Sequence, residues 1–266
     1  DGVDKVTGRA NFGADFQLPG MLVGRVLRSP HAHAKIKSID ASKALALAGV
    51  KAVVTAADFP EIGPKERGAG ESPVVFRDVS RNVMARDKAL YDGHAVAALA
   101  ATTAAIASEA LKLIEVEYEV LPHVLDPREA MKSDAPVIHD DVFTKGLEEN
   151  PDKPSNVTQR FEFAMGDTDA GFKDAEIIVE NDYTAQAVHQ GYIEPHACVA
   201  SRSEDGMTML WGSSQGHFMV RNFTSKICGM DISELRVIPA EIGGGFGGKT
   251  TVYLEPLAVM LSKKSG

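Results

Sequence analysis

The feature that most constrains the fold is a proline-rich, charged stretch near the middle of the chain. Residues 122–156 contain prolines at positions 122, 127, 136, 151 and 154, spaced among acidic and basic side chains. Proline fixes φ and removes a backbone donor, so neither a regular helix nor an inner strand runs through such a segment. The sequence therefore predicts an N-terminal domain over residues 1–130, a linker over 131–156 and a C-terminal domain over 157–266.

Both sides of the linker mix strand-like alternation with helix-like periodicity, which predicts an α+β fold rather than a regular β-α-β series. Strands are expected at 21–27, 51–55, 95–101, 114–120, 157–164, 176–186 and 235–239, and a hairpin over 196–213 turns at 204–206. Helices are expected at 42–48, from Thr102 or Thr103 to 113, over 216–228 with a stop at Gly229, and from after residue 250 to about 264. Residues 1–20 and 60–82 are expected to be loops.

The composition is that of an acidic globular chain. Of 266 residues, 44% are apolar and 24% charged, and the net charge of −9 gives no basic footprint for nucleic acid or an anionic membrane. No apolar run is long enough for a membrane span.

Cys198 and Cys228 form neither a zinc motif nor a disulfide framework, so they are expected to be buried free thiols in a reducing, cytoplasmic compartment. Because the chain begins at Asp1 and stops directly after a helical pattern, it is interpreted as a piece of a longer product.

The most chemically informative segment is a glycine run, Gly243–Gly248, followed by Lys249 and Thr250. Glycines here let the backbone approach a ligand closely, and free N–H groups favour an anion or oxo group. The run fits both the nucleotide-binding P-loop pattern over Gly243–Thr250 and the dinucleotide fingerprint, and it also fits a plain packing turn. Only 16 residues follow Thr250, too few for either nucleotide-binding domain.

A third interpretation comes from motifs spread along the chain in order. They include DGVDKVTGRANFGA at 1–14, LPGMLVGRVLRSPHAHAKIKSID at 18–40, GVKAVVTAADFP at 49–60, YDGHAVAALAA at 91–101, EVEYEVLPHVLDPREAM at 115–131, GYIEPHACVA at 191–200, SSQG at 213–216 and IGGGFGGK at 242–249. Together they resemble the front part of the molybdenum subunit of xanthine dehydrogenase/aldehyde oxidase-type hydroxylases. The resemblance implies an α/β hammerhead-like domain followed by the truncated start of the molybdopterin-binding domain.

The resemblance also implies site residues. Gln215 matches the family glutamine whose amide hydrogen-bonds an oxo ligand of the molybdenum, and Phe246 matches the aromatic residue that lines the substrate pocket; both are predicted to be catalytic. Gln215, Gly245, Phe246 and Gly247 are predicted to bind the cofactor, the last three through their N–H groups. The pterin holds the metal, so no protein ligand is predicted. His31, His33 and Glu194 are interpreted as structural.

The implied activity is hydroxylation of an aromatic heterocycle, an aryl-CoA or an aldehyde, with water as the oxygen source. Thr250 stands where purine-oxidising members carry a glutamate, which argues against xanthine. The implied cofactor is molybdopterin, in the plain or the cytosine dinucleotide form, with iron–sulfur clusters and FAD on partner domains or subunits. The catalytic glutamate and most pterin contacts lie in the remainder of the subunit, so the chain is expected to be inactive alone. A P-loop protein and a non-catalytic assembly subunit are the alternatives.

Overall fold

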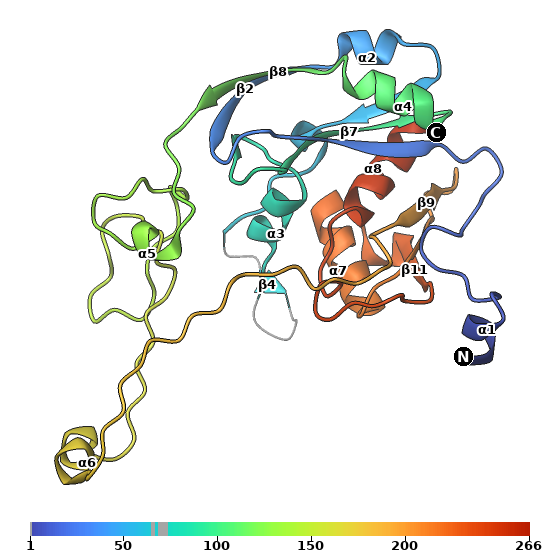
Figure 1. Cartoon of the computed structure of the whole chain (residues 1–266). Coiled ribbons are helices and arrows are strands. Elements are labelled where there is room, and N and C mark those ends of the chain that lie inside the picture. Colours follow the sequence, from blue (N-terminus) through green and yellow to red (C-terminus); the bar gives the residue numbers. More distant parts are fainter. Residues whose placement is uncertain (1, 65–66, 69–73) are drawn as a thin grey trace. The chain divides into compact units, whose positions relative to one another are not determined.

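The computed structural model describes residues 2–64, 67–68 and 74–266 (Figure 1). The chain folds as two compact units. The first contains the residues up to Leu121 together with Gln190–Gly266, and the second is Pro122–His189. Both halves of the first unit are therefore folded against each other, although some 70 residues separate them in sequence.

A three-stranded antiparallel sheet lies at the centre of the first unit. Its order is β1 (Val23–Arg28), β7 (Ala95–Ala101), β3 (Val50–Val54), and all seven residues of β7 are buried. Val53, Ala97 and Leu99 pack with the buried alanines of α2 (Ser42–Ala46) and α4 (Ala104–Leu111). The alternate residues of the same strands, such as Val54 and Ala98, pack with α8 (Glu255–Ser265). Figure 1 shows α2 and α4 on one side of β7 and α8 on the other, so the period-two alternation of strands accounts for both layers.

Local signals placed these elements correctly. The Thr103 hydroxyl accepts a hydrogen bond from the Ile106 N–H at 3.2 Å and caps α4, as predicted. A second sheet has the strand order β6 (Lys88–Ala89), β2 (Ala34–Asp40), β8 (Glu115–Val120). Its strand β8 confirms the strand expected at 114–120. Its exposed face carries lysine–glutamate pairs, including Lys37 with Glu119 at 2.7 Å.

Two expected loops contain helices. A short helix, α1 (Gly2–Val6), lies inside the predicted loop 1–20, and α3 (Phe76–Val83) begins inside the predicted loop 60–82 and ends one residue beyond it. The α3 helix is anchored by tertiary packing, because Phe76 is buried edge-on against the Phe223 ring with centroids 5.4 Å apart. The short strands β4 (Arg67–Gly68) and β5 (Val74–Val75) pair in the same segment, and residues 65–66 and 69–73 of the predicted loop lie outside the described residues.

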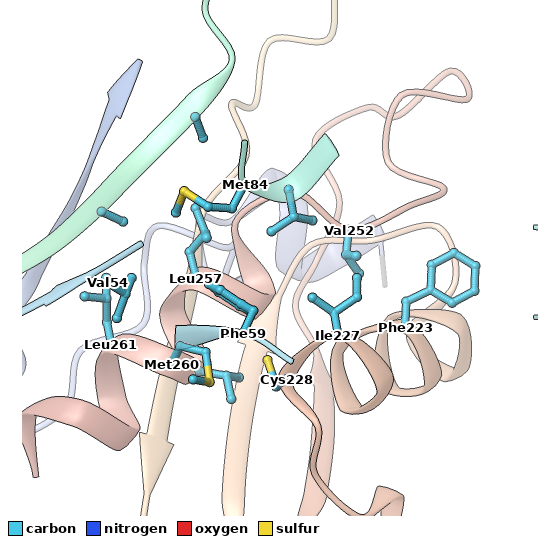
Figure 2. Close-up of a cluster of buried hydrophobic side chains, with 14 of the residues drawn as sticks. Val54, Phe59, Met84, Phe223, Ile227, Cys228, Val252, Leu257, Met260 and Leu261 are labelled. Atoms are coloured by element: carbon cyan, nitrogen blue, oxygen red, sulfur yellow. The ribbon is translucent and has the colours of Figure 1, made fainter. Parts of the chain in front are cut away.

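The C-terminal part of the first unit forms a mixed sheet. As predicted, β9 (Cys198–Arg202) and β10 (Thr208–Gly212) form an antiparallel hairpin. Next to it, β11 (Leu235–Pro239) runs parallel to β10, and α7 (His217–Cys228) makes the crossover. Gly229, at φ +62°, ends α7 in the left-handed region. The apolar sides of α7 and α8 meet in one core, where Phe223, Ile227, Leu257 and Met260 are buried (Figure 2). Two 3-10 turns, η1 (Ala56–Asp58) and η2 (Ile232–Glu234), complete the unit.

The second unit contains α5 (Pro127–Ala130) and α6 (Thr168–Asp174). The predicted strands at 157–164 and 176–186 are wrong: among the described residues these stretches are irregular and exposed, apart from a single bridge between Lys145 and Gln159. Phe161 is 79% exposed and Ile177 is 81% exposed. The apolar alternation is present, but a strand also needs a partner whose backbone accepts its hydrogen bonds. No helix among the described residues has the length and apolar content that crossing a bilayer requires.

His94 gives the first unit a predictable response to acid. Its ring is buried and holds one neutral tautomer, because Nδ1 accepts from the Leu90 N–H at 3.2 Å while Nε2 lies 2.7 Å from the Arg81 carbonyl. Burial lowers the pKa of His94 below its ordinary value of 6.5. As the pH falls, the unfolded chain therefore protonates His94 at a higher pH than the folded chain does. The contribution of neutral His94 to the free energy of unfolding is full above about pH 6.5 and is lost as the pH falls toward the lowered pKa of the folded state.

We therefore expect His94→Phe to reduce the loss of unfolding free energy between about pH 7.5 and about pH 5.5. Urea denaturation at several pH values measures this slope, and His123→Phe, at an exposed histidine, is the control. An unchanged slope in His94→Phe would contradict the assignment.

Candidate functional site

The glycine run forms a loop between β11 and α8. Backbone φ angles are +100° at Gly244, +46° at Phe246 and +84° at Gly247, and the Gly248 N–H donates to the Gly245 carbonyl at 2.6 Å. The loop does not lead straight into a helix, because α8 begins only at Glu255. A P-loop requires its helix to start at the lysine and threonine, so the geometry argues against that alternative.

Gln215 follows β10 and makes three hydrogen bonds with the loop. Its Oε1 accepts hydrogen bonds from the N–H groups of Gly247 at 3.1 Å and Lys249 at 3.2 Å, and its own N–H donates to the Lys249 carbonyl at 2.9 Å. Only the amide oxygen can accept from two N–H donors, which fixes the orientation of the side-chain amide. Its Nε2 takes no partner within the described part of the chain, and the side chain is exposed, so two N–H donors remain for a ligand.

Gly245 must be glycine because Gln215 occupies the space beside it. A Cβ at residue 245 would lie 2.5 Å from Gln215 Oε1. The same holds elsewhere in the run, where a Cβ on Gly243 would meet the Glu194 side chain and one on Gly248 would meet the Tyr192 ring, each at 2.6 Å. The glycines thus let the loop close onto its neighbours, in addition to any approach to a ligand.

Phe246 is held in an unusual conformation. It is the one non-glycine residue with positive φ among the described residues, and 73% of it is exposed. A bulky residue in this region carries backbone strain, and an exposed aromatic ring gains no burial in return. The loop therefore leaves the Phe246 side chain exposed, one residue before the Gly247 N–H that donates to Gln215.

A buried ion pair lies beneath the loop, and sequence analysis did not assign it a role in the site. Lys249 is 1% exposed, and its Nζ lies 2.6 Å from Glu194 Oε2, 3.5 Å from Ser213 Oγ and 4.9 Å from the centre of the Tyr192 ring. The lysine is therefore not free to bind a phosphate. The signal that could have revealed the pair is a lysine inside a glycine run, since a buried ammonium group requires an acidic partner.

Glu194 also accepts the N–H groups of Gly13 at 3.1 Å, through Oε1, and of Gly243 at 2.7 Å, through Oε2. Burial by itself raises the pKa of Glu194, but the hydrogen bond from Lys249 and those from Gly243, Gly13 and Ser213 together lower it below the ordinary value. The carboxylate is consequently ionised at neutral pH. Tyr192, whose ring Lys249 contacts, leads to two further rings. Its hydroxyl lies 2.8 Å from His196 Nε2, and the His196 ring meets Tyr253 edge-on.

The two early histidines belong to no metal-binding group among the described residues. His31 and His33 are in the turn between β1 and β2 rather than on a strand, and the His31 ring packs edge-on against Tyr118. Across residues 2–64, 67–68 and 74–266, no group of three acidic, histidine or cysteine side chains is placed to hold a metal ion.

Comparisons with known proteins match two domain families to successive parts of the chain. The family described as "Aldehyde oxidase and xanthine dehydrogenase, a/b hammerhead domain" matches residues 7–122, and the molybdopterin cofactor-binding domain family matches residues 149–266. The chain is 39% identical to the carbon monoxide dehydrogenase large chain of Afipia carboxidovorans, over 92% of this chain and 30% of that protein. It is 34% identical to a probable xanthine dehydrogenase subunit of Bacillus subtilis, over 100% of this chain and 33% of that protein.

Solved structures give the same result. Quinoline 2-oxidoreductase from Pseudomonas putida 86 superimposes with a TM-score of 0.83 at 29% identity, over 98% of this chain and 32% of that one. The chain thus spans about a third of the length of these relatives. It belongs to the xanthine dehydrogenase/aldehyde oxidase family of molybdenum hydroxylases, and it comprises the hammerhead domain and the first part of the molybdopterin-binding domain of the large subunit.

Proposed function

We propose that this chain supplies one wall of the cofactor site in a molybdenum hydroxylase that acts on an aromatic heterocycle, an aryl-CoA or an aldehyde, with water as the oxygen source. The observation that carries the proposal is the fixed amide of Gln215. Its oxygen is held by Gly247 and Lys249, so its Nε2 donors point away from these two N–H groups, and Phe246 in the same loop is exposed. A neutral donor and an aromatic surface suit an oxo-type acceptor next to a planar substrate.

The loop fits the molybdenum cofactor. A Cβ on Gly247 would meet nothing within 4 Å, so this part of the loop borders open space. The Gly247 N–H is already donated to Gln215, so we propose that the N–H groups of Gly245 and Phe246, together with Gln215 Nε2, contact the group. When bound, the molybdenum cofactor supplies the redox chemistry, while these residues orient it and donate hydrogen bonds to it.

Residue 250 bears on the substrate class. The Thr250 hydroxyl donates to the Gly247 carbonyl at 3.0 Å and thereby braces the loop. A threonine side chain has no carboxylate, which is the group that the resemblance associates with purines at this position. We therefore propose a substrate other than xanthine.

We further propose that the working enzyme needs more than these residues. Under this proposal, iron–sulfur clusters, FAD and the remainder of the molybdenum subunit complete it. The clusters lie on partner domains or subunits, since Cys198 and Cys228, the chain's two cysteines, cannot ligate a cluster. The cofactor is molybdopterin, in the plain or the cytosine dinucleotide form. Within the chain, residues 1–130 form the hammerhead-like domain, 131–156 the linker and 157–266 the start of the cofactor domain. The chain alone is inactive under this proposal.

The test is cofactor occupancy in the complete subunit within its complex. We expect Gly245→Ala to lower bound molybdenum and pterin by about tenfold or more, as loss of supporting contacts does at metal sites, because the new Cβ displaces the Gln215 amide. Gly171→Ala is the control, since a Cβ there meets nothing within 4 Å. Metal analysis and pterin fluorescence measure the outcome. Equal occupancy in the two variants, or an assembled wild-type complex without molybdenum, would contradict the proposal.

A further inference from the structure

Glu194 connects three segments that are distant in sequence. Its carboxylate accepts from Gly13 in the N-terminal segment and from Gly243 at the start of the glycine loop, and it pairs with Lys249 at the end of the loop. Beside it, the Glu241 N–H donates to the Asn11 carbonyl at 2.9 Å, so the N-terminal segment also meets the backbone just before the loop.

Lys249 links the Glu194 carboxylate to Gln215. The lysine side chain ends on Glu194, whereas its backbone N–H donates to Gln215 Oε1 and its carbonyl accepts from the Gln215 N–H. The Ser214 hydroxyl donates to the same carbonyl at 3.2 Å. Any displacement of the Lys249 backbone therefore changes the direction of the Gln215 amide.

The pair is also enclosed. The side chain of Lys249 is 1% exposed and that of Glu194 is 10% exposed, so water cannot solvate the charge that remains when one partner is removed unless the surroundings rearrange. An ammonium or carboxylate left alone in such surroundings moves or draws in solvent. Exposed ion pairs, by contrast, are replaced by water at little loss.

From this connectivity we propose that Glu194 and Lys249 are positioning residues, which set the glycine loop so that the Gln215 amide faces the cofactor. The inference rests on the proposed function for its biological meaning. The protection of the loop amides can be measured without cofactor, so failure of this inference and failure of the proposed function are distinguishable.

The experiment compares Glu194→Gln, Lys249→Met and the double variant. Amide hydrogen exchange of Gly243, Gly247 and Lys249 in the ¹⁵N-labelled chain reports the loop, and urea denaturation reports global stability. We expect each single variant to speed exchange at these amides by about tenfold or more, while amides of β10 change only in proportion to the loss of global stability. Lys264→Met is the matched control, because Lys264 Nζ lies 2.6 Å from Asp58 but is 47% exposed.

The double variant separates positioning from stability. It removes both charges, so it should regain much of the global stability that the single variants lose. If the pair positions the loop, exchange at Gly247 and Lys249 stays fast in the double variant. The proposal is overturned if loop exchange returns to the wild-type rate together with stability, or if the single variants leave exchange unchanged. Should a single variant not fold, the double variant alone gives the decisive comparison.

Discussion

Replacing Phe223 with alanine should lower the free energy of unfolding by about 3–5 kcal/mol. Phe223 is 2% exposed in α7 and meets the ring of Phe76 edge-on, in the core between α7 and α8. The alanine leaves a cavity in this core, and the aromatic contact with Phe76 is lost as well. Urea denaturation followed by circular dichroism measures the change.

Phe218 supplies the control on the same helix. It lies in the first turn of α7 and is 88% exposed, so Phe218→Ala should change the unfolding free energy by less than about 0.5 kcal/mol. Similar losses in the two variants would show that Phe223 is not packed as described.

The second large effect concerns activity. Gln215→Glu in the complete enzyme should lower kcat by about a hundred- to a thousandfold, the loss seen when one oriented donor is removed from an active site. The glutamate oxygens can still accept from the Gly247 and Lys249 N–H groups, so the loop should stay closed. The substitution removes the Nε2 donors and places a negative charge toward the cofactor.

This variant distinguishes a chemical role from a structural one. Amide exchange at Gly247 should remain as in the wild type while kcat falls, and Gln17→Glu, at an exposed glutamine, should leave both unchanged. Full activity in Gln215→Glu would contradict a donor role for this amide. Faster exchange at Gly247 would show instead that the substitution opens the loop.

Sequence patterns predicted the elements whose signals are local. The Thr103 cap, the Gly229 stop and the turn at 204–206 each depend on residues within one turn of the chain, and the structure confirms all three. The α3 helix was missed because its anchor, the contact of Phe76 with Phe223, joins residues far apart in sequence. The strands expected at 157–164 and 176–186 failed for the opposite reason, since alternation was present without a pairing partner.

In the candidate site, too, the sequence did not predict contacts between residues that are far apart in the chain. The resemblance identified Gln215 and Phe246 as site residues, and the structure places Gln215 in contact with the loop that carries Phe246. The resemblance did not show that the Gly247 N–H is already donated to Gln215, because that depends on how a loop closes in space. The Glu194–Lys249 pair spans 55 residues of sequence, and no spacing rule links such partners.

The position of α8 affects how this chain is made. One face of the β1–β7–β3 sheet is covered by α2 and α4, which are synthesised at nearly the same time as the strands. The other face is covered by α8, which begins at Glu255, roughly 150 residues after β7 ends. At about 5–20 residues per second, that face stays uncovered for about 10–30 s of synthesis. The nascent chain therefore emerges with an apolar sheet face open to chaperones and to neighbouring nascent chains until α8 appears.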